Sequence, residues 1–139
     1  MTLMTSSDIL SIVWDKVHNS ALHNAVPTMY KDHFPTTHAS TMEGEFVVIN
    51  TLSNTISDTQ IATVNINIYV PDTTPRINKE MQRYPNYKRL EELTKLAYEA
   101  IRCYPINEHF FFDVRGESLY SEEDIPYTFS NIKVQIKNY

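Results

Sequence analysis

The stretch that decides the fold is QIATVNINIYV, residues 60–70. From Ala62 onward, apolar and polar residues alternate strictly. Side chains of a β-strand alternate between its two faces, so this stretch is predicted to be a strand with one buried face and one wet, amide-rich face. The wet face consists of Thr63, Asn65, Asn67 and Tyr69. No catalytic motif lies on or near this stretch, so it indicates a fold and not a reaction.

The segment just upstream, residues 45–52 (EFVVINTL), is also rich in β-branched and aromatic residues. Its apolar side chains fall on both faces, which is typical of an inner strand or of one covered by a neighbouring subunit. The seven residues between the two segments, 53–59, are small and polar. The two segments are therefore predicted to form a long antiparallel hairpin with a polar tip.

Two longer segments have helical periodicity. In residues 7–22 the apolar side chains form one stripe of a helical wheel, and Ser6 or Ser7 is placed to cap the first turn. Residues 86–103 have an apolar stripe opposite a charged face. The i,i+4 pairs of opposite charge on that face indicate a solvated surface. Residues 78–82 are predicted to form a single helical turn.

The remaining segments complete an α+β prediction. Residues 26–30 are predicted to be a short edge strand, because Pro27 has no amide hydrogen for a central one. Residues 109–120 and 127–139 are predicted strands joined by the turn SEEDIP. Residues 1–139 are expected to form one domain, with an antiparallel sheet of about four to five strands and two helices packed on one face.

Composition excludes several classes of function. The net charge is −5, which argues against a protein that grips nucleic acid through clustered lysine and arginine. The two glycines, Gly44 and Gly116, are too few for a glycine-rich phosphate loop. The one cysteine, Cys103, forms no intrachain disulfide and is typical of a reducing cytoplasm. Neither a membrane-spanning apolar run nor a signal peptide is expected.

Candidate sites for chemistry are sparse. His33 and His38 lie five residues apart beside Asp32, but no further histidine or cysteine cluster completes a metal site. Pro71-Asp72 resembles the start of a metal-dependent nuclease core, but the nearest candidate for its acidic residue and lysine, Glu92 and Lys95, is one position too long. The acidic residues 122–124 lack the loop spacing of a calcium site. We therefore predict no catalytic residue, no metal and no cofactor.

A set of motifs spans residues 30–89 and a little beyond. Tyr30-Lys31 precedes the strand EFVVIN at residues 45–50. It is followed by Q-x-x-x-x-N-I-N-I-Y-V-P-D at residues 60–72 and by NYKRLEEL at residues 86–93. In this order the motifs resemble a small protein encoded in the structural gene clusters of tailed phages and prophages of gut Bacteroidales. The order of elements is similar to that of the tail-completion, or tail-terminator, proteins of long-tailed phages.

The resemblance implies a tail-terminator-like fold and a non-enzymatic virion component at the head–tail junction or neck. It implies a homo-oligomeric ring, which would be a hexamer, or twelve-fold in a connector setting. Its partners would be other neck, tail or portal-associated proteins, and DNA would pass through the lumen without specific binding. The chain would fold in the host bacterial cytoplasm and end in the virion, with no membrane partner.

The subunit contact is predicted from the surfaces that this fold leaves available. These are the hairpin tip and the wet face of the central strand, together with the loop at residues 33–43 and the C-terminal strands. The residues predicted to make this contact are Asn54, Thr55, Ile56, Ser57, Asp58, Asn65, Asn67 and Tyr69. The alternative is a small phage-encoded regulatory or host-binding protein that docks a partner on the edge of the same sheet.

Overall fold

The structure, a computed structural model, describes residues 3–34, 44–73, 76–77, 80–81, 83–102, 105–107, 110–122 and 125–139. The helices are α1 (Ser6–His18), α2 (Ala21–Ala25) and α4 (Tyr87–Ala100). The strands are β1 (Met29–Lys31), β2 (Phe46–Ile56), β3 (Gln60–Pro71), β4 (Arg76–Ile77), β5 (Glu80–Met81), β6 (Pro105–Asn107), β7 (Phe110–Ser121) and β8 (Tyr127–Asn138). The predicted α+β fold is confirmed.

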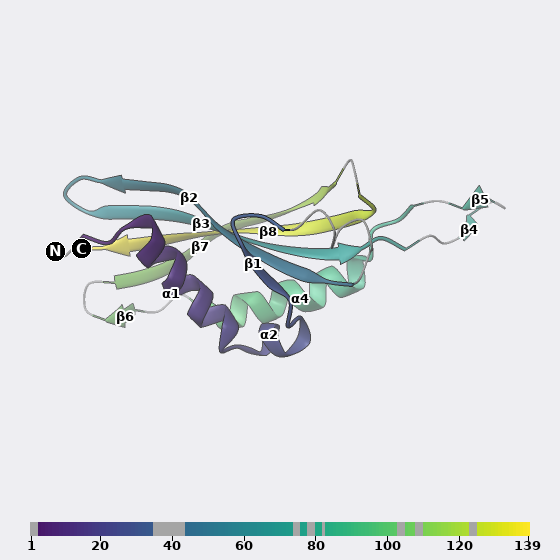
Figure 1. Ribbon diagram of the computed structural model, residues 1–139, viewed down its shortest axis with the longest axis horizontal. Coiled ribbons are helices and arrows are strands. Elements are labelled where there is room, and N and C mark those ends of the chain that lie inside the picture. The colour runs from purple at the N-terminus through teal and green to yellow at the C-terminus, as the bar shows by residue number, and fades with distance from the viewer. Residues whose placement is uncertain are drawn as a thin grey trace.

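Six strands form the main sheet in the order β1-β2-β3-β8-β7-β6, and the helices lie along one side of it (Figure 1). Strand β3 lies at its centre, where Ile66 is opposite Ile49 of β2 and Ile132 of β8. The sheet is mixed and not wholly antiparallel as predicted, because β1 runs parallel to β2. Residues 32–45 between β1 and β2 are long enough for the return crossover that parallel neighbours require.

The helix side of the sheet forms the main core. The alternate apolar residues of β3 predicted to face inward are at most 1% exposed: Ala62, Val64, Ile66, Ile68 and Val70. They share one buried cluster with Ile9, Val13 and Val17 of α1 and with Leu90, Leu93 and Ala97 of α4. Strand β2 is buried on both faces from Phe46 to Ile49, as predicted. The apolar side chains of both helices therefore pack against those of the central strands in one core.

The N-terminal helix differs from the prediction at both ends. Thr5 and not Ser6 or Ser7 caps it, because the Asp8 amide donates to Thr5 Oγ1 and the Thr5 amide donates to Asp8 Oδ2. Helix α1 ends at His18, and α2 is a separate five-residue helix. Between them the Ser20 hydroxyl donates to the Val17 carbonyl at 2.6 Å, a side-chain bond that competes with helix continuation.

Two loop predictions are also corrected. Strands β2 and β3 extend to Ile56 and Gln60, so the hairpin loop has three residues where seven were predicted. The predicted helical turn at residues 78–82 is wrong at Glu80–Met81, which form β5 and pair antiparallel with β4; its other residues lie outside the described part of the chain. Figure 1 shows β4 and β5 on an extension beyond the end of the sheet.

Candidate functional site

A buried amide holds the β2–β3 hairpin against the N-terminal segment. The Gln60 Nε2 donates to the Met4 carbonyl at 2.7 Å and to Asn54 Oδ1 at 2.9 Å. Its Oε1 accepts from the Met4 amide at 3.1 Å and from Asn138 Nδ2 at 3.0 Å. Gln60 is 1% exposed, so this network is protected from water. The hairpin is therefore a fixed part of the sheet at the end where both chain ends lie (Figure 1).

Four exposed apolar side chains lie on or near this hairpin. We call this surface, formed by Leu3, Leu52, Ile56 and Tyr139, the hairpin end. Leu52 and Ile56 of β2 are 59% and 52% exposed. Leu3 and Tyr139, the chain neighbours of the residues that bond Gln60, are 54% and 49% exposed. Strand β1 pairs with β2 only as far as Ile49, so among the described strands none covers the outer edge of β2 beyond it. Apolar residues on an open strand edge are typical of a surface that another chain covers.

The residues predicted at the hairpin tip divide into two groups. Asn54 is directed inward, because its Nδ2 donates to the Met4 carbonyl at 3.4 Å and its Oδ1 accepts from Gln60. Ile56 is exposed, and so are three polar residues around the turn: Thr55, Ser57 and Asp58. Of the five predicted tip residues, Ile56 therefore offers the apolar area that a subunit contact needs.

The remaining predicted contact residues lie on the other face of β3 and are not wet. Asn65 and Asn67 are each 8% exposed, and Tyr69 is 6% exposed. Asn131 of β8 donates through Nδ2 to Asn67 Oδ1 at 2.6 Å and to Asn65 Oδ1 at 3.2 Å. Asn65 in turn donates to Asn50 Oδ1 of β2 at 2.9 Å. The expectation of a wet face is wrong here because paired strands place these amides opposite one another, where they satisfy each other.

An aromatic row lies beside the amides on the same face. Phe46, Tyr69, Phe129 and Tyr120 occupy directly paired positions on β2, β3, β8 and β7. Their successive ring centroids are 4.6, 4.7 and 5.4 Å apart. The Tyr69 hydroxyl donates to Glu122 Oε1 at 3.2 Å, and burial together with the Glu122 charge raises the pKa of Tyr69. This row stabilises the sheet, and Tyr120 at its end is 48% exposed.

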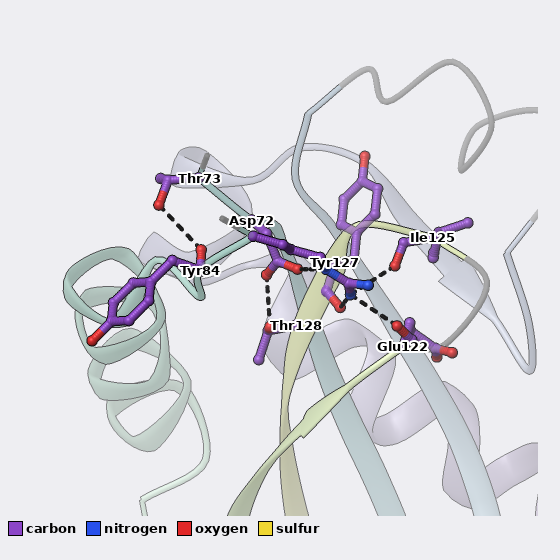
Figure 2. A network of polar contacts seen from close by, with 8 residues as sticks. Asp72, Thr73, Tyr84, Glu122, Ile125, Tyr127 and Thr128 are labelled. Carbon is purple, nitrogen blue, oxygen red and sulfur yellow. Dashed lines mark hydrogen bonds and ion pairs between the residues drawn. The ribbon is translucent and has the colours of Figure 1, made fainter. Parts of the chain in front are cut away.

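Arg83 bonds Asp72, which follows β3, and three backbone carbonyls around the turn from β7 to β8. Figure 2 labels these partners. The Nε of Arg83 pairs with the Asp72 carboxylate just after β3, and its Nη2 donates to the carbonyls of Glu122, Ile125 and Tyr127 at 2.8, 2.9 and 3.1 Å. Asp72 also accepts from the Thr128 hydroxyl at 2.7 Å. The side chain of Asp72 is 2% exposed, so its carboxylate is committed to structure. The nuclease-like Pro71-Asp72 pair is thus part of a structural clamp.

A groove of about 360 Å³ runs between α4 and β7, and we call it the α4–β7 groove. It is lined by Tyr87, Leu90, Glu91, Thr94, Lys95, Tyr98, Glu117 and Leu119. At its base the Thr94 hydroxyl donates to Ser130 Oγ at 2.8 Å, and the Ser130 hydroxyl donates to Glu117 Oε1 at 3.3 Å. Burial and the Glu117 charge raise the pKa of Tyr98. The groove combines apolar walls with two carboxylates, Glu117 and Glu91, and Glu91 is paired with Lys95. Mostly apolar walls with a few polar groups are typical of a ligand-binding surface.

The candidate metal residues do not come together within the described residues. There the structure contains no group of three or more histidine, cysteine, aspartate or glutamate side chains that could hold a metal ion. His38, Cys103, Glu123 and Asp124 lie outside the described residues. Among the described helices, none is long and apolar enough to cross a membrane.

Comparison with known proteins adds no family assignment. No protein-family model matches the chain, and no curated protein matches it either. The resemblance to tail-completion proteins therefore stays a prediction, and the functional argument depends on the surfaces described above.

Sequence reasoning missed three functional features of these surfaces. Leu52 and Leu119 lie within apolar strands, and the alternation pattern alone does not separate an exposed leucine from a buried one. Arg83 lies between β5 and α4, in a segment that contains Pro75 and Pro85. Two arginines, Arg76 and Arg83, follow Asp72 in this segment, and the sequence does not indicate which of them pairs with it.

Proposed function

We propose that this protein is a structural virion component of a tailed phage, a ring-forming subunit of the tail-completion or tail-terminator type at the head–tail junction. The observation that carries the proposal is the hairpin end. Leu52 and Ile56 are more than half exposed on an open edge of β2, while Gln60 keeps that edge rigid. A rigid apolar edge of this kind is suited to permanent coverage by another subunit.

Ring closure requires a contact between two different surfaces of the same chain. The hairpin end supplies one of them, and it lies at the opposite end of the sheet from the β4–β5 extension (Figure 1). A contact between unlike surfaces is heterologous, and a heterologous contact closes into a ring when its rotation allows. The net charge of −5 suits a lumen through which DNA slides without adhering.

Quantitative mass spectrometry of purified virions tests this proposal. We expect the chain at a fixed copy number per particle, a multiple of six, because a hexameric or twelve-fold ring contributes whole rings. A copy number that varies between preparations, or absence from particles that package DNA normally, would contradict the proposal. The measurement needs the particle made by the host that encodes this chain.

The alternative is a phage-encoded regulatory or host-binding protein that docks a partner on a sheet edge. The α4–β7 groove favours it, because a helix beside a strand edge is a recurring geometry for peptide docking. The same virion measurement separates the two functions. A regulator is found in infected cells and is missing from mature particles.

A further inference from the structure

One edge of β7 is open over most of its length. Strand β8 pairs with β7 on one side from Phe110 to Ser121. On the other side β6 pairs only with Phe110 and Phe111, and no further described strand lies there. An open edge presents unpaired N–H and C=O groups that accept an added strand. The stretch from Phe112 to Ser121 is therefore long enough for an extended peptide.

The α4–β7 groove lies beneath this open edge. Glu117 and Leu119 are paired with Ile132 and Ser130 of β8, which place them on the helix side of the sheet. Leu119 is 42% exposed, and the facing helix contributes Tyr87 and Tyr98, which are 51% and 37% exposed. A strand added to β7 sends every second side chain toward this side. Those side chains enter a space bounded by leucine and tyrosine, by the Glu91–Lys95 ion pair and by the carboxylate of Glu117.

The charges around the groove favour a ligand with a cationic side chain. Residues 116–131 contain four carboxylates and no lysine or arginine. Glu117 accepts a bond from Ser130 and forms no ion pair with any described cation. Lys95 on the groove wall is already paired with Glu91 at 2.8 Å, and Arg83 is paired with Asp72. A cationic side chain placed opposite Glu117 therefore gains an ion pair without displacing another.

We infer that the α4–β7 groove binds an extended segment of a partner protein in which an apolar residue is followed, two positions later, by lysine or arginine. The order follows from an added strand antiparallel to β7. In that direction the residue opposite Leu119 precedes the residue opposite Glu117. The inference is independent of ring formation, because it uses neither Leu52 nor Ile56 of the hairpin end.

Fluorescence anisotropy with designed peptides tests the inference. The probe is fluorescein-labelled TVTLTRTVT, and its matched control is TVTLTETVT. We expect the arginine peptide to bind and the glutamate peptide to bind at least about tenfold more weakly, because like charges oppose each other at Glu117. The arginine peptide with N-methyl groups at alternate amides should not bind, since strand addition needs its N–H groups. Equal binding of the three peptides, or no saturation by about 1 mM, overturns the inference.

Two variants locate the binding site. Glu117→Gln should lower the affinity for the arginine peptide by about fivefold, and it should not lower the affinity for the glutamate peptide. Glu99→Gln, an exposed glutamate on α4 that does not line this groove, should change neither affinity. An equal effect of the two substitutions would overturn the inference.

A further pair of measurements separates this inference from the proposed ring. Ile56→Asp should retain peptide binding, and Glu117→Gln should retain any assembly seen by sedimentation. Amide hydrogen exchange of residues 116–121 should slow on addition of the arginine peptide. If these amides are instead protected in proportion to protein concentration without peptide, a second copy of this chain fills the groove and the inference is overturned.

Discussion

Arg83→Met is expected to destabilise the protein strongly, because Arg83 joins Asp72 to three backbone carbonyls around the turn from β7 to β8, which is distant in sequence. Figure 2 labels these partners. The side chain of Asp72 is 2% exposed, and among the described residues the substitution leaves its carboxylate bonded only to the Thr128 hydroxyl. Removing one partner of a buried ion pair costs about 3–5 kcal/mol. The side chain of Arg83 is 38% exposed, so water can solvate part of the site that it leaves. The lower limit of this range therefore applies. We expect a loss of about 3 kcal/mol in the free energy of unfolding.

Urea unfolding followed by the fluorescence of Trp14, the only tryptophan, measures this loss. With a slope of about 1.5 kcal/mol per M, the midpoint should fall by about 2 M. Lys95→Met is the control, because it removes an exposed pair with Glu91 and should cost less than about 1 kcal/mol. Adding Asp72→Asn to Arg83→Met should recover part of the loss by removing the unpaired charge. Equal midpoints for Arg83→Met and Lys95→Met would refute this account of the clamp.

Two pH dependences provide further predictions. The backbone amide and then the side chain of Thr5 hold the pKa of Asp8 below its ordinary value of 3.8. The stabilisation by this carboxylate is therefore complete above pH 3.8 and is lost as the pH falls below it. Asp8→Asn should lower the melting temperature more at neutral pH than at about pH 2.5, and an equal effect at both pH values would contradict this assignment. Burial, and then the Glu122 charge, raise the pKa of Tyr69 above 10.0, so its contribution is complete below pH 10.0 and is lost as the pH rises. Urea unfolding at a series of alkaline pH values measures this loss. The free energy of unfolding should fall less steeply with pH in Tyr69→Phe than in the native chain, and an equal slope would contradict this assignment.

The sequence predicts those parts of the fold that are determined by local periodicity. Strand β3 and helix α4 follow directly from alternation and from a helical stripe, because one face of each packs on the same core. The break between α1 and α2 is different. Apolar periodicity continues through it, and the Ser20 side chain decides the end of the helix through a bond that periodicity does not encode.

Other features depend on contacts between distant segments. The amides of Asn65 and Asn67 have the composition of a wet face, yet they are buried because Asn131 and Asn50 lie in register with them. The parallel direction of β1 is likewise set by its pairing with β2 and not by its own sequence. The hairpin was predicted as a contact surface from its polar tip, whereas the exposed apolar area is on Leu52 and Ile56. Exposure of this kind is set by the whole fold, so alternation alone does not locate it.

The central claim is that this chain assembles with itself through the hairpin end. Native mass spectrometry of the purified protein, alone and with an extract of disrupted virions, tests that claim most directly. We predict a closed oligomer of one defined stoichiometry for the native chain. We predict that the double variant Leu52→Asp/Ile56→Asp does not form this oligomer. The two substitutions place charges on the exposed edge of β2 without altering the buried core. A native chain that stays monomeric in both conditions, or an oligomer that survives the double substitution, would contradict the account.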